Sequence, residues 1–154
     1  MVKILTSEDY KKKIFPEQAN NNYQGHRVAY VTFIIITILT LGRSCIHVFA
    51  QDGGATSIAG VDTSLLDGKN VISMFALWGE SQLLMGVIYV IVILYYRNLI
   101  PLMYILVIIE YFGRILIGFY KPLTTMHVPP GAIGNFIIIP LALIMMKLSL
   151  MQKK

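Results

Sequence analysis

The stretch LIPLMYILVIIEYFGRILIGFY, residues 99–120, is apolar along its length and holds only two charged side chains, Glu110 and Arg114. A helix needs about 20 apolar residues to cross the hydrocarbon core of a bilayer, so this run is long enough to span one. A charged side chain at the centre of a membrane helix costs about 2.5 to 3.5 kcal/mol even on the lenient insertion scale. We therefore expect Glu110 and Arg114 to face other helices and not lipid.

Three further apolar runs, residues 28–49, 71–96 and 133–150, have similar lengths. The chain of 154 residues is 56% hydrophobic and 14% charged, with a mean hydropathy of +0.66, which is too apolar for a soluble domain of this size. The sequence predicts an all-α, polytopic membrane protein with four transmembrane helices in one antiparallel bundle over residues 28–150. No room remains for a separate soluble domain.

Lysine and arginine gather on one side of the predicted spans, in the leader (residues 1–27), in the short link near residue 97 and toward the C-terminal tail (residues 151–154). The positive-inside rule then predicts an integral, multi-pass protein of the cell membrane with both termini in the cytoplasm. The basic residues on that side are Lys3, Lys11, Lys12, Lys13, Arg27, Arg97, Lys147, Lys153 and Lys154, against Lys69 and Lys121 on the other.

The polar leader allows two interpretations. Thr6 or Ser7 can cap a short helix that Pro16 ends, and such a helix would lie on the membrane surface. The alternative is a solvated tail. The apolar side of the helix would consist of Ile4, Leu5, Ile14 and Phe15.

Four charged side chains lie inside the spans: Arg43, Glu80, Glu110 and Arg114. Counted from the external ends of their helices, the arginines lie about six residues in and the glutamates about nine or ten, which separates them by only about 5 Å in depth. Glu110 and Arg114 are four residues apart on one helix face, an order that favours an ion pair. We expect Arg43 to pair with Glu80 across a helix interface, so that the four charges cancel.

A purely structural interpretation of this layer stays open, because polar residues also hold membrane helices together where small residues allow close approach. Gln82 and Tyr89 lie on a face of the second span away from Glu80, so we expect them to pack against another helix or subunit or to reach headgroups. The small residues are Gly42, Ser44, Ala76, Gly79, Gly86, Gly113 and Gly118.

Templates for catalysis and metal binding mostly fail. His47, Glu80 and Glu110 resemble the ligands of di-metal bundles, but the Glu-x-x-His pairs of such sites are absent and an arginine beside a carboxylate disfavours a cation. We find no phosphate-binding glycine loop, no paired-cysteine motif and no Ser/His/Asp set. The sequence therefore predicts no metal site and no cofactor, disfavours an enzyme, and gives no sign of nucleic-acid binding.

The order of features from about Val28 onward resembles a family of small four-span membrane proteins known only as a domain of unknown function. The resemblance rests on Pro101, on the Glu-x-x-Gly-Arg motif formed by Glu110, Gly113 and Arg114, and on the proline-containing loop that follows. The polar leader departs from the family pattern. Because that family has no settled activity, the resemblance implies a fold and no mechanism.

Two functions from different classes remain open. In the first, a binding or transport module, Arg43, His47 and Arg114 receive a small anionic or lipid-like ligand, and Glu80 and Glu110 release the arginines as it binds. In the second, a non-catalytic assembly subunit, the charged layer is structural and the chain docks a larger membrane protein or a second copy. An enzyme acting on lipid ranks third. The docking faces would carry Gln82, Tyr89, Tyr96, Tyr104 and Tyr111.

Overall fold

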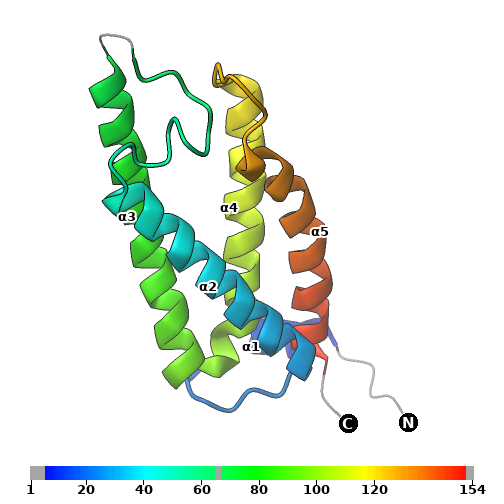
Figure 1. The fold of residues 1–154 in the computed structure, drawn as a ribbon. Coiled ribbons are helices and arrows are strands. Elements are labelled where there is room, and N and C mark those ends of the chain that lie inside the picture. Colours follow the sequence, from blue (N-terminus) through cyan, green and yellow to red (C-terminus); the bar gives the residue numbers. More distant parts are fainter. Residues whose placement is uncertain (1–5, 65–66, 152–154) are drawn as a thin grey trace.

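The computed structural model describes residues 6–64 and 67–151, and over these residues the chain is helical with no strand. Four of the helices are long and apolar enough to cross a membrane, and they pack together, each antiparallel to the one before it (Figure 1). The predicted all-α fold is confirmed, with span boundaries within a few residues of those expected. The long helices are α2 (Arg27–Phe49), α3 (Gly68–Tyr95), α4 (Ile100–Tyr120) and α5 (Pro130–Leu150).

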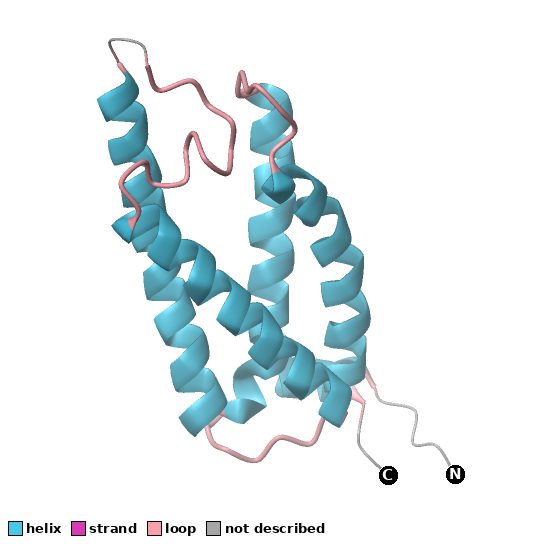
Figure 2. Ribbon diagram, in the orientation of Figure 1, coloured by secondary structure: helices cyan, strands magenta, loops and turns pink. Residues whose placement is uncertain are grey.

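The long helices pack mainly as two pairs, α2 with α3 and α4 with α5. Helix α2 crosses the bundle diagonally, so that its first turns reach α5 (Figure 1). Helices α3 and α4 are joined by the 3₁₀ turn η1 (Arg97–Leu99), and they diverge away from it (Figure 1). We call the end with η1 the leader end, and the opposite end, where residues 50–64 and 121–129 lie, the loop end (Figure 2).

The apolar core occupies the half of the bundle nearer the leader end. Phe33 lies edge-on to Tyr89 and Tyr104, with ring centroids 5.2 and 5.6 Å apart. The Tyr104 hydroxyl donates a hydrogen bond of 2.6 Å to the carbonyl of Ala29, which satisfies both groups away from water. The core consists of Ala29, Phe33, Ile36, Tyr89, Val92, Ile100, Met103, Tyr104, Val107 and Ala142.

Glycines bring α2 and α3 into close contact. A Cβ placed on Gly79 would lie 2.5 Å from the Cβ of His47, and one on Gly86 would lie 2.6 Å from Leu41. The predicted close approach is confirmed at these two positions. It is wrong for Gly42, Gly113 and Gly118, where an added Cβ would meet nothing within 4 Å.

The leader forms a helix, α1 (Ser7–Ile14), which begins with a reciprocal capping box between Thr6 and Asp9. The predicted helix and its Thr6 cap are therefore confirmed, and its position on a membrane surface stays a prediction. Helix α1 packs across the leader end against α4, α5 and η1, and the Lys13 ammonium donates a 2.6 Å hydrogen bond to the carbonyl of Leu150. The Ile4, Leu5, Lys3, Lys153 and Lys154 positions lie outside the described residues.

The two loops at the loop end touch each other. The backbone N–H of Met126 donates to the carbonyl of Gly60 at 2.7 Å.

The carboxylate of Asp52 accepts hydrogen bonds from the backbone N–H groups of Gly54 and Ser57 at 2.9 and 2.7 Å. These bonds favour the ionised carboxylate and lower the pKa of Asp52 from 3.8 to about 2.

Candidate functional site

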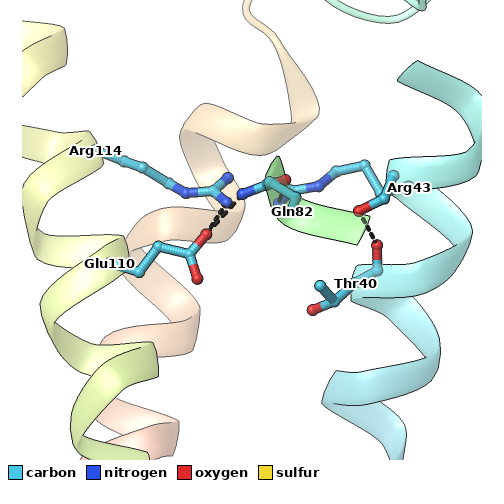
Figure 3. A network of polar contacts seen from close by, with 6 residues as sticks. Thr40, Arg43, Gln82, Glu110 and Arg114 are labelled. Atoms are coloured by element: carbon cyan, nitrogen blue, oxygen red, sulfur yellow. Dashed lines mark hydrogen bonds and ion pairs between the residues drawn. The ribbon is translucent and has the colours of Figure 1, made fainter. Parts of the chain in front are cut away.

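Gln82, on α3, links α2 and α4 through its side-chain amide. The guanidinium of Arg43, on α2, donates a 2.5 Å hydrogen bond to Gln82 Oε1, and Gln82 Nε2 donates a 2.6 Å hydrogen bond to Glu110 Oε1 on α4 (Figure 3). Gln82 itself is only 6% exposed. One neutral amide thus connects a cation and an anion that lie on different helices, and it uses both its acceptor and its donor to do so.

Glu110 and Arg114 form the ion pair that their spacing predicts, so this pair is confirmed. The Arg114 side chain is 14% exposed and that of Glu110 is 30% exposed. The pair is therefore half-buried, and part of it can be reached from the molecular surface.

Glu80 does not join this network, and the predicted Arg43–Glu80 pair is wrong. Arg43 turns to Gln82, whereas Glu80 is exposed and forms no hydrogen bond or ion pair with any described residue. The physical reason is the helical period, because positions 80 and 82 are about 200° apart around α3. The helix can present only one of them to α2 and α4.

Trp78 brings the two arginines to one place. The guanidinium carbons of Arg43 and Arg114 lie 5.4 and 5.2 Å from the centre of its indole ring, within the range of cation–π attraction. Arg114 also lies over Tyr111, at 4.8 Å. Trp78 is 40% exposed, so this meeting point of two cations lies at the surface of the network and not in its interior.

His47 lies beside the network and forms no direct bond to the two arginines. Its ring is buried, 4.9 Å from the ring of Trp78, and its Nδ1 lies 2.7 Å from the carbonyl oxygen of Gly53. Because a carbonyl oxygen only accepts hydrogen bonds, Nδ1 carries the proton. Thr40 and His47 both lie against glycines of α3, so they share the face of α2 that packs on α3.

The network is positively charged and not neutral. Within the described residues it holds two guanidinium groups, Arg43 and Arg114, against the single carboxylate of Glu110. Arg114 Nε and the hydroxyl of Tyr89 are buried without a hydrogen-bond partner in the described structure. Buried donors of this kind are costly, so the layer has both spare charge and spare donors.

The expectation that Gln82 and Tyr89 pack against another helix is confirmed, since both contact α2. The alternative, in which these residues and Tyr104 form docking faces, is wrong. Gln82, Tyr89 and Tyr104 are all buried inside the bundle, where they form the polar bridge and the aromatic core. Tyr96 is exposed and Tyr111 is partly buried beside Arg114. A surface for a partner must therefore be sought elsewhere.

The three residues that resemble the ligands of a di-metal bundle have separate surroundings in the structure. Glu110 is engaged by Gln82 and Arg114, Glu80 faces outward and His47 bonds to a loop carbonyl. Over residues 6–64 and 67–151, no group of three or more His, Cys, Asp or Glu side chains could hold a metal ion.

Sequence reasoning missed Gln82 and Trp78 as members of the network. A usable signal for Gln82 was present, because Gly79, Gln82, Gly86 and Tyr89 follow the three- and four-residue spacing of one helix face. Glycines mark the face that approaches a neighbouring helix, so they also indicate that Gln82 points inward. Trp78 carries no comparable signal, since tryptophan in a membrane helix is also typical of the membrane interface.

Comparison with protein-family models, with curated proteins and with solved structures finds no match for this chain. The resemblance to a four-span family therefore stays a prediction that rests on the short motif around Glu110 and Arg114.

Proposed function

We propose that this protein is a multi-pass membrane protein that binds a small anionic or lipid-like ligand at the layer formed by Arg43, Gln82, Glu110 and Arg114. Both termini lie in the cytoplasm in this proposal, because the basic residues concentrate at the leader end. The ligand enters from the loop end and its negative charge meets the two guanidinium groups beside Trp78.

The observation that carries the proposal is the charge imbalance of the layer. One net positive charge at membrane depth costs several kcal/mol unless it is neutralised, and Glu80 does not neutralise it because it faces outward. An anion bound between Arg43 and Arg114 would remove that cost. The cost of the unliganded state thus becomes a driving force for binding.

The geometry also suits an oxyanion. Guanidinium groups recognise carboxylate and phosphate through two parallel N–H donors, and Arg114 Nε is a donor that the described residues leave unused. Trp78 holds both guanidiniums near one ring, and partial exposure of Trp78 and Glu110 leaves a way in. Gln82 keeps Arg43 connected to Glu110 before the ligand arrives, and Arg114 pairs with Glu110 directly.

Calorimetric titration of the purified protein in neutral detergent tests this proposal. The probes are acetate, inorganic phosphate and a short-chain phosphatidylglycerol, and the matched variants are Arg114→Gln and Arg97→Gln. Arg97 lies at the leader end, where its Nε donates to the carbonyl of Ile93. We expect Arg114→Gln to weaken binding at least tenfold, or about 1.4 kcal/mol, and Arg97→Gln to leave it unchanged. Equal binding by both variants, or no binding by the wild type, contradicts the proposal.

A second candidate function, assembly with another membrane protein, is favoured by Glu80. Gln82 bonds to Glu110, which stands midway along α4, and Glu80 precedes Gln82 by two residues, or about 3 Å along the axis. An exposed carboxylate at that depth meets hydrocarbon unless a partner covers it. A transmembrane helix with a lysine or arginine at matching depth would supply the missing charge.

A synthetic partner tests this candidate. We would measure energy transfer in phosphatidylcholine vesicles between the labelled protein and a leucine-rich helix of about 20 residues with one central lysine. Association with the wild type and its loss in Glu80→Gln would support the assembly role. Equal association by both proteins, or transfer as strong to an all-leucine helix, would rule out recognition through Glu80.

A further inference from the structure

The segment that connects α1 to α2, residues 15–26, is fastened to the leader end by backbone and amide hydrogen bonds. Asn98, in η1, accepts from the backbone N–H of Asn20 at 2.8 Å and donates its own backbone N–H to the Asn20 carbonyl at 3.2 Å. The backbone N–H of His26 donates to the carbonyl of Leu148 at 3.1 Å. The segment therefore has a defined position against α5 and η1.

This segment closes over a cavity of about 200 Å³ at the leader end. One wall is tight, since a Cβ on Gly25 would lie 2.3 Å from the carbonyl oxygen of Ser149. Most of the lining residues are polar, and they include two lysines and no carboxylate. Its residues are Lys12, Lys13, Pro16, Asn20, Asn22, Tyr23, Gln24, Gly25, Asn98, Pro101 and Ser149.

The two lysines of the cavity differ in their contacts. Lys13 is held by its hydrogen bond to the carbonyl of Leu150. Lys12 lines this cavity and the more open hollow beside it, and it forms no hydrogen bond or ion pair within the described part of the chain. The only carboxylate lining either space is Glu17, in the outer hollow. Lys12 thus places an unpaired positive charge where this cavity opens to the outer hollow.

We propose that this cavity binds a phosphate group, carried either by an anionic lipid headgroup or by free phosphate. Lys12 supplies the charge, and the side-chain amide of Asn22 supplies a neutral donor. A phosphate group accepts hydrogen bonds from ammonium and amide groups at once. A cavity of about 200 Å³ has room for such a group. The position at the end of the apolar helices is the level at which lipid phosphates lie.

Hydrogen exchange at the backbone amides of Asn20 and His26 reports on this cavity, because both amides fasten the segment that closes it. The probes are inorganic phosphate and dioctanoyl phosphatidic acid, added to the full-length protein in neutral detergent. We expect either probe to slow exchange at these amides. Protection by the lipid at far lower concentration than by phosphate assigns the site to a headgroup, and equal potency assigns it to free phosphate.

Adjacent lysines give matched variants. Lys12→Gln should raise the apparent Kd for protection roughly tenfold, whereas Lys12→Arg should preserve binding. Lys11→Gln removes the same charge from the same helix at a position that lines neither space, and it should have no effect. No protection by either probe, or equal weakening by Lys11→Gln and Lys12→Gln, would overturn the proposal.

Discussion

Gln82 and Glu80 are two residues apart on α3, yet Gln82 is buried and bonded to Arg43 and Glu110 while Glu80 is exposed. The inward position is thus occupied by a neutral amide and the outward one by a charge. This arrangement leaves the interior layer positive and the outer surface of α3 negative at nearly the same depth. Both candidate functions depend on this orientation of α3 about its own axis.

The two glutamates should differ sharply when their charge is removed. Glu110→Gln takes the carboxylate from Gln82 and Arg114, and we expect it to lower the free energy of unfolding by about 1.5 to 3 kcal/mol. Glu80→Gln should stay within about 0.5 kcal/mol of the wild type in detergent, because Glu80 is exposed. Chemical unfolding of both variants measures these changes. Equal losses of unfolding free energy would show that Glu80 belongs to the network.

Glycines of the same helix type should differ by their surroundings. Gly79→Ala places a methyl group against His47, and we expect a loss of about 1 to 3 kcal/mol from overpacking. Gly113→Ala enters open space and should be neutral or slightly stabilising, because alanine favours a helix more than glycine does. Thermal unfolding in one detergent compares them, and a similar loss in both would show that α2 and α3 do not pack as described.

Much of the fold could be predicted from the sequence, because length and apolarity alone define the four long helices. The Glu110–Arg114 pair was equally accessible, since it depends on local spacing within one helix. The orientation of α3 about its axis could not be predicted in this way. Opposite charges at Arg43 and Glu80 suggested a pair, but the glycine-bearing face of α3 packs against α2 and leaves Glu80 outside. Which polar residue points inward depends on packing against α2, and charge matching gave the wrong answer.

The loop at residues 50–60 should loosen in acid. Asp52 has a pKa of about 2 in the folded loop, below its ordinary value of 3.8. Its stabilising effect is therefore present above about pH 4 and lost as the pH falls toward 2. Pepsin cleavage of the loop at several pH values measures this, with Asp52→Ala as reference. We expect cleavage to be slower in the wild type near pH 4 and the two rates to converge near pH 2. A ratio of the two cleavage rates that stays constant with pH would show that the hydrogen bonds of Asp52 do not stabilise the loop.

The orientation of the chain can be tested by labelling single cysteines in a Cys45→Ala background, since Cys45 is exposed. A membrane-impermeant maleimide added outside intact cells should modify Thr124→Cys, at the loop end, and spare Lys11→Cys, at the leader end. The reverse labelling pattern would show that both termini lie outside.

The most direct test of the central claim is the unfolding free energy of Arg43→Gln with and without phosphate at constant ionic strength. The variant leaves Arg114 balanced by Glu110, so the layer becomes neutral. We predict that Arg43→Gln is at least as stable as the wild type without phosphate. With Lys12→Gln introduced into both proteins to remove the phosphate site proposed at the leader end, phosphate should stabilise only the protein that keeps Arg43, by about 2.7 kcal/mol at one hundred times its Kd. Equal stabilisation of both proteins, or a variant less stable than the wild type without phosphate, would contradict the claim that the layer carries an uncompensated positive charge that binds an anion.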